Sequence, residues 1–120
     1  MSYLDLRFRA QRDVTARIVE RPTRHLSTEA VAALTADLQA VARTVLGDAP
    51  LDYGAISGDP ERLADSVLTV LYDQAGRPIA FNALAWMDLE LRGRPSSVLH
   101  LGLVMVDPAV RSQGLSWVLY

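Results

Sequence analysis

The pattern of apolar and polar positions predicts one long helix and a later run of strands. Apolar side chains recur every three or four positions over residues 28–46, which places them on one face of a helix. Ser27 is a favourable N-cap for this helix, and Gly47 marks its end. Further along, Asp59 followed by Pro60 predicts the start of a second, short helix.

The other apolar segments have the length and the flanking turn residues of strands. Strands are predicted over residues 14–20, 67–72, 78–91 and 97–106. The last one ends in a run that is apolar on both faces, which is typical of a strand in the middle of a sheet. Residues 3–9 alternate loosely and predict either a further strand or a mobile extension. The pattern predicts a mixed α and β fold with a mostly antiparallel sheet and helices packed on it.

Composition sets the size of the domain and removes several kinds of chemistry. The chain has 120 residues, 50% of them apolar, which suits one domain with a core. It has no cysteine, which excludes disulfides, thiolate metal sites and cysteine nucleophiles. All 12 basic residues are arginine, which excludes a lysine Schiff base. We expect no metal site, because the 2 histidines have no acidic partners nearby.

Charge is distributed unevenly along the chain. Residues 1–24 hold six arginines against three acids, a net charge of +3, and the six arginines and eleven acids of the remainder give −5. Such a basic segment either meets a polyanion or is a solvated strand and loop. No nucleic-acid motif accompanies it, so we expect no nucleic-acid partner. With no membrane-spanning stretch and no signal peptide visible, the cytoplasm is the expected location and no membrane partner is expected.

The segment that points most clearly to chemistry joins the last predicted strand to a turn and a helix. The strand residues are Val104, Met105 and Val106, and Arg-x-x-Gly-x-Ser follows them. Unpaired backbone N–H groups at such a helix start can hold a phosphate. Arg111 adds positive charge, and Gly114 leaves room where a phosphate approaches the backbone. The alternative is an ordinary strand–turn–helix connection with a surface arginine.

This order, Val-x-Pro-x-x-Arg-x-x-Gly-x-small after an apolar strand, resembles the acyl-CoA signature of the GNAT N-acetyltransferase superfamily. The resemblance implies that residues 111–116 bind the CoA pyrophosphate and that pantetheine pairs with the preceding strand. The cofactor-binding residues it implies are Val104, Met105, Val106, Arg111, Ser112, Gln113, Gly114, Leu115 and Ser116. The sequence departs from the family at Ser116, usually glycine or alanine there, and at Ser112 or Gln113, where a basic residue is common.

The resemblance also implies the reaction. It is the transfer of an acetyl or other acyl group from acyl-CoA to an amine, by direct attack in a ternary complex and without a metal. His100 stands where the family often has a glutamate, and alternation places it on the face of Gly102 and Val104. It is either a general base or a structural histidine. Asn82 and Trp86 share one face of the neighbouring strand and are candidates to line an acceptor pocket, with the core as the alternative for Trp86.

The resemblance covers residues 14–120 and leaves 1–13 as an N-terminal extension. The chain stops at Tyr120, about two turns into the signature helix, so we expect an incomplete domain that is inactive or weakly active alone. Without a neighbouring strand, residues 97–106 would form an apolar edge that invites a second copy or a partner chain. Three interpretations stay open: part of an acyltransferase, a CoA-binding or interaction module completed by a partner or by strand exchange, and a small α+β module whose Arg-x-x-Gly turn is incidental.

Overall fold

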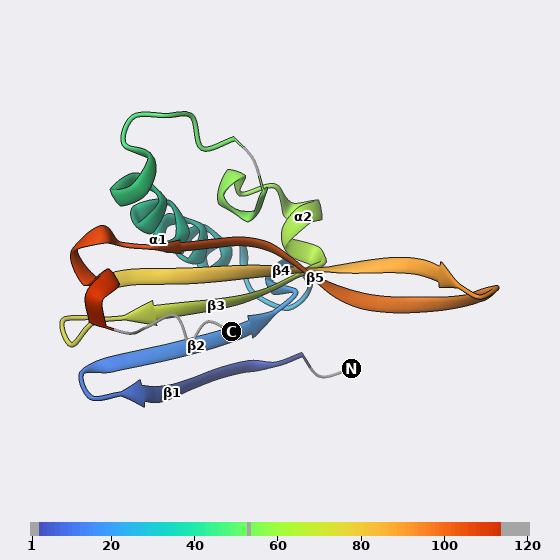
Figure 1. Cartoon of the computed structure of the whole chain (residues 1–120), viewed down its shortest axis with the longest axis horizontal. Helices are drawn as coiled ribbons and strands as arrows, with labels where there is room; N and C mark the ends of the chain where they lie inside the picture. The colour runs from blue at the N-terminus through green and yellow to red at the C-terminus, as the bar shows by residue number, and fades with distance from the viewer. Residues whose placement is uncertain (1–2, 53, 114–120) are drawn as a thin grey trace.

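A computed structural model describes residues 3–52 and 54–113 (Figure 1). For residues 87–91, 96–98, 100, 101 and 111–113, only the path of the backbone is described. The strands are β1 (Asp5–Gln11), β2 (Val14–Glu20), β3 (Ser66–Tyr72), β4 (Pro78–Leu91) and β5 (Arg94–Val106). The α-helices are α1 (Thr28–Leu46) and α2 (Pro60–Ala64), and the 3-10 helices are η1 (Pro22–Arg24), η2 (Gly54–Ser57) and η3 (Pro108–Gln113).

The five strands form one sheet in chain order, β1 to β5, and every neighbouring pair is antiparallel. Both α-helices lie on the same face of this sheet, as Figure 1 shows. The predicted fold of mixed class, with a mostly antiparallel sheet and helices packed on it, is confirmed. Of the two alternatives for residues 3–9, the strand is the one observed, because β1 pairs with β2 from Asp5 onward.

The two α-helices begin where the sequence predicts, because side-chain caps satisfy their first turns. The hydroxyl of Ser27 accepts a hydrogen bond from the Ala30 N–H at 3.1 Å. The carboxylate of Asp59 accepts one from the Glu61 N–H at 3.0 Å. The predicted helices, one long and one short, are therefore confirmed.

Apolar side chains cover both faces of the sheet. On the helix face, α1 packs its buried residues against the centre of β2 to β5. The main core of this face includes Val19, Leu34, Leu38, Val41, Leu68, Val70, Phe81 and Met105. A smaller cluster on the opposite face contains Val14, Ala16, Leu71, Ile79 and Ala80, with Val104, Val106 and Val110 packed against it.

Strand β5 lies at the edge of the sheet in the described part of the chain. The described residues include one neighbour of β5, which is β4. The prediction that both faces of this strand are covered is confirmed, because Met105 faces the α1 core, whereas Val104 and Val106 pack on the opposite cluster. Alternating residues of β5 are apolar because both faces of the sheet carry a core.

Strands β4 and β5 extend well past the rest of the sheet. Pairing between β3 and β4 stops at Ala85, whereas β4 and β5 remain paired to Leu91 and Arg94. The extra length forms a two-stranded ribbon that projects from the sheet (Figure 1). The strand predicted over residues 97–106 accordingly begins at Arg94.

A hydrogen bond links α1 to the sheet near the start of the β3–β4 turn. The half-buried Tyr72 hydroxyl donates to the Asp37 carboxylate of α1 at 2.7 Å. Burial, followed by the hydrogen bond to Asp37, raises the pKa of Tyr72 well above its usual value. The folded chain therefore holds this proton more tightly than the unfolded chain does.

We predict that Tyr72→Phe lowers the free energy of unfolding at pH 8 by about 1 kcal/mol, the net value of one hydrogen bond. Because the folded-state pKa of Tyr72 is the higher one, the unfolded chain loses its proton first, above pH of about 10. The stabilisation is present below that pH and is lost as the pH rises. Urea denaturation at pH 8 and pH 11 should show the difference between the two proteins shrinking. A difference that grows with pH would contradict the assignment.

Candidate functional site

The ladder between β4 and β5 is interrupted at Gly102, where β5 holds one residue more than β4 can pair. Ala83 pairs with Leu103 and the next residue, Leu84, pairs with Leu101, so Gly102 forms a β-bulge. A methyl group added at Gly102 would lie 3.3 Å from the carbonyl oxygen of Ala83, which explains the absence of a side chain. The bulge leaves local backbone groups outside the regular ladder.

The bulge changes the face to which His100 belongs. By register His100 pairs with Ala85, on the face shared by Ala83 and Leu103, not on the face of Val104 and Val106. The prediction that His100 shares a face with Val104 was therefore wrong, because the extra residue breaks the two-residue period of the strand. The side chain of His100 lies outside the described residues.

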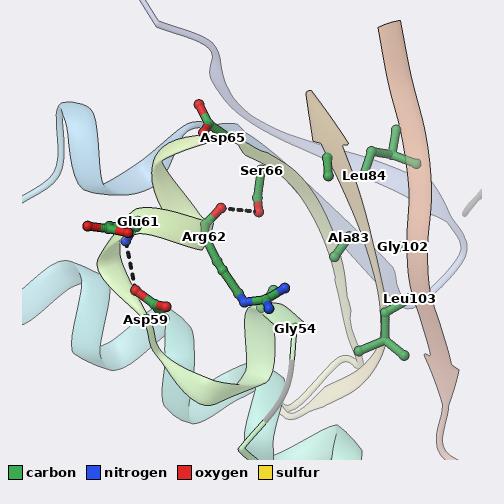
Figure 2. Close-up of a pocket in the computed structure, with 12 residues that line it drawn as sticks. Gly54, Asp59, Glu61, Arg62, Asp65, Ser66, Ala83, Leu84, Gly102 and Leu103 are labelled. Carbon is green, nitrogen blue, oxygen red and sulfur yellow. Dashed lines mark hydrogen bonds between the residues drawn. The ribbon is translucent and has the colours of Figure 1, made fainter. Parts of the chain in front are cut away.

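A hollow of about 590 Å³ opens beside the bulge, on the helix face of the sheet (Figure 2). Its sheet side is formed by Ala83, Leu84, Ala85, Gly102 and Leu103, and its other side by η2, α2 and the residues around them. The volume falls within the range of small-molecule sites. Small residues account for the space, since glycine and alanine fill little of the gap between α2 and the strands.

Charged residues from α2 and its ends line the hollow: Asp59, Glu61, Arg62 and Asp65. Asp59 is engaged as the helix cap, and Asp65 forms an ion pair with Arg24 at 2.9 Å. The Arg62 side chain runs from α2 toward Gly54, which brings its guanidinium group into the hollow (Figure 2). That group makes no hydrogen bond or ion pair with any residue of the described chain.

Strand β5 leads directly into the turn that the sequence motif marks. Asp107 is 5% exposed, and its carboxylate accepts a hydrogen bond from the Ala109 N–H at 3.0 Å. Its other oxygen lies 3.5 Å from the Arg77 guanidinium. Its backbone N–H donates to Ile79 of β4 at 2.8 Å. Asp107 thus joins the start of η3 to β4 through its backbone N–H, and to the turn before β4 through Arg77.

The structure describes the predicted cofactor-binding residues only in part. Val104, Met105 and Val106 form the end of β5, as predicted. The backbone of Arg111, Ser112 and Gln113 belongs to η3, a 3-10 helix that begins at Pro108. Their side chains, together with the whole of Gly114, Leu115 and Ser116, lie outside the described residues.

The two residues proposed for an acceptor pocket, Asn82 and Trp86, do not line the hollow. Asn82 is 4% exposed and pairs with Val104, on the sheet face away from α1 and α2. Trp86 is half-buried, and the Arg21 guanidinium lies over its ring at 5.4 Å from the centroid. The positions of Asn82 and Trp86 outside the hollow therefore give no support to an acceptor-binding role for them.

Other candidate features of the described chain have local explanations. Of the arginines in residues 1–24, Arg17 pairs with Asp5 at 2.8 Å and Arg24 pairs with Asp65. His25 stacks on Tyr3 with ring centroids 5.1 Å apart. Within residues 3–52 and 54–113, no group of three or more His, Asp or Glu side chains could hold a metal ion. In the same ranges, no helix has the length and apolar character that crossing a bilayer requires.

Comparison with solved structures identifies the fold. A crystal structure of an acetyltransferase from Trypanosoma brucei matches 89% of this chain and 69% of that chain, with a TM-score of 0.59 and 22% sequence identity. No family model matches the sequence, and no curated protein does. The chain therefore shares its fold with that acetyltransferase, and at this sequence identity the similarity extends to the fold alone.

Sequence reasoning missed three residues that shape this site. Gly102 did have a local signal, since a glycine inside a strand often marks a bulge, but only the register of β4 against β5 shows the extra residue. Arg62 sits in a short polar helix, and only the fold brings it beside the strands. Asp107 did have a signal: aspartate before proline at the end of a strand is a typical turn-capping residue.

We predict that Asp107→Ala lowers the free energy of unfolding by about 1–2 kcal/mol, because it leaves the Ala109 N–H without its acceptor. Asp107→Asn keeps an oxygen for that bond and should lose less. Urea denaturation of the three proteins at neutral pH measures both effects. Equal stability of Asp107→Ala and the unsubstituted chain would show that the carboxylate does not organise the turn.

Proposed function

We propose that the chain is an acyltransferase domain that transfers an acetyl group from acetyl-CoA to the amine of a small molecule, in a ternary complex. The observation that carries the proposal is the β-bulge at Gly102. It lies beside the hollow and on the strand that runs into the η3 turn. The fold shared with a T. brucei acetyltransferase supports it.

The proposed cosubstrate follows β5 from its end toward the bulge. Its pyrophosphate binds at the signature residues Arg111, Ser112, Gln113, Gly114, Leu115 and Ser116, through backbone N–H groups and the arginine. Pantetheine then pairs with the free edge of β5 at Val104, Met105 and Val106, as an added strand. This direction brings the thioester to Gly102, where the hollow begins.

The reaction step needs few side chains. The amine nitrogen attacks the thioester carbonyl carbon, a C–N bond forms, the C–S bond breaks, and CoA leaves as the thiolate. The amine gives up a proton in the process, which a base or water accepts. Backbone N–H groups freed by the bulge are suited to stabilise the negative charge that develops on the carbonyl oxygen.

His100 is the proposed base, on the strength of its register position. It pairs with Ala85, and Ala85 lines the hollow into which the acceptor would bind. The unperturbed pKa of a histidine is suited to accepting a proton near neutral pH. The change of face caused by the bulge supports this role, since it moves His100 to the side of the sheet that carries the hollow.

A second function is favoured by the free edge of β5. In the described part of the chain this strand has one neighbour, β4, so its outer edge is open to pairing with another chain. A CoA-binding or protein-interaction module completed by a partner or by strand exchange would use that same edge. Acetyl-CoA and a partner strand would then compete for it.

We predict that this chain binds acetyl-CoA in isothermal titration calorimetry. Arg111→Ala should weaken binding about tenfold, since a charge-assisted hydrogen bond to phosphate is lost. Gly114→Glu should abolish binding, because it puts a carboxylate where the pyrophosphate approaches. Arg7→Ala is the matched control: Arg7 is an exposed residue of β1, at the other edge of the sheet.

Equal acetyl-CoA binding by the unsubstituted chain and the three variants, or binding by none of them, would contradict the proposed cosubstrate site. Binding that is lost in Arg7→Ala as strongly as in Arg111→Ala would point to a general effect of charge instead.

A further inference from the structure

We propose that the acceptor amine also carries an acidic group, a carboxylate or a phosphate, and that Arg62 binds this group in the hollow. This inference rests on the proposed acyl transfer and names the class of its acceptor. It comes from one side chain that the reaction itself does not use.

Arg62 is unusual among the charged residues around the hollow. Its guanidinium group reaches past α2 to Gly54 and lies inside the hollow (Figure 2). The backbone that carries it is held in place: the Ser66 hydroxyl donates to the Arg62 carbonyl at 2.6 Å. The guanidinium itself has no ion pair or hydrogen bond within the described chain. Its five N–H donors are therefore free for a ligand.

Arg62 shares the hollow with the carboxylates of Asp59, Glu61 and Asp65. Asp65 is paired with Arg24 and Asp59 caps α2, and none of the three forms an ion pair with Arg62 within the described chain. The lining as a whole is acidic, and the guanidinium is the group in it that can bind an anion. A planar guanidinium matches the oxygens of a carboxylate or a phosphate in a two-bond arrangement, which makes those groups its preferred partners.

The position of Arg62 also orients the acceptor. The amine has to reach the thioester at the β5 side of the hollow, near Gly102, whereas Arg62 enters from the α2 side. An acceptor with its amine at one end and an acid at the other would span the hollow between these two walls. The residues between them are small, among them Gly54, Ala83 and Ala85, so the space is open to the ligand.

Three amines with the same two-carbon spacer test the proposal: ethanolamine without an acidic group, β-alanine with a carboxylate, and O-phosphoethanolamine with a phosphate. Binding is followed in the ¹⁵N-labelled chain by the shifts of the Gly54 and Gly102 amides, which line the hollow. We expect at least one acidic amine to bind about tenfold more tightly than ethanolamine. The acidic amine with the larger increase in affinity over ethanolamine identifies the group, carboxylate or phosphate, that the site prefers.

Arg62→Gln should remove this advantage, whereas Arg7→Gln should retain it with the same change in net charge. Arg62 is exposed and its guanidinium makes no contact that the fold needs, so the variant is expected to keep its stability. Arg62→Lys keeps the positive charge but not the planar guanidinium that can form two parallel hydrogen bonds. It should therefore lose part of the affinity difference between acidic amines and ethanolamine.

The proposal is overturned if all three amines bind equally, or if Arg62→Gln leaves the preference unchanged. Release of free thiol from acetyl-CoA separates this outcome from failure of the proposed function. Suppose that the unsubstituted chain and the Arg62→Gln variant both acetylate ethanolamine at the same rate as the acidic amines. The proposed acyl transfer is then supported, and the proposed acidic acceptor is contradicted. If acidic amines bind through Arg62 but acetyl-CoA does not bind, the anion site is supported and the proposed acyl transfer is contradicted.

Discussion

The pairing of β4 with β5 is the constraint on which the site depends, because β5 carries one residue too many for a regular ladder. Gly102 takes up that residue as a bulge, and its missing side chain allows the Ala83 carbonyl oxygen to come close. Before the bulge, His100 pairs with Ala85; after it, Leu103 and Met105 lie on the helix face. A single extra residue thus decides which positions of the strand meet α1, α2 and the hollow.

The rest of the site follows from what surrounds the bulge. On one side, α2 is anchored by its Asp59 cap and brings Arg62 over a floor of glycine and alanine. On the other side, the strand continues to Asp107, whose buried carboxylate caps the η3 turn and whose backbone N–H bonds to β4. The hollow and the turn therefore lie along one strand, an arrangement suited to a long ligand that binds at the turn and reacts at the bulge.

Local patterns predicted most of the elements, since caps, apolar periods and turn residues act over a few positions. The Ser27 cap and the helix face of Leu34 and Leu38 are of this kind. The bulge at Gly102 and the position of Arg62 depend on register and on contacts between distant segments, which no local pattern contains. The error over His100 has the same origin, because strict alternation assumes an unbroken ladder. The hollow beside Ala83 and Ala85 likewise exists only once α2 is folded onto the strands.

Hydrogen–deuterium exchange along β5, with and without acetyl-CoA, tests the central claim most directly. If the cosubstrate binds at the η3 turn and pairs with the free strand edge, exchange should slow in residues 103–106 and 111–113. Exchange in β1, the strand at the opposite edge of the sheet, should not change. Unchanged exchange throughout β5 at saturating acetyl-CoA, or slowing confined to β1, would contradict the account.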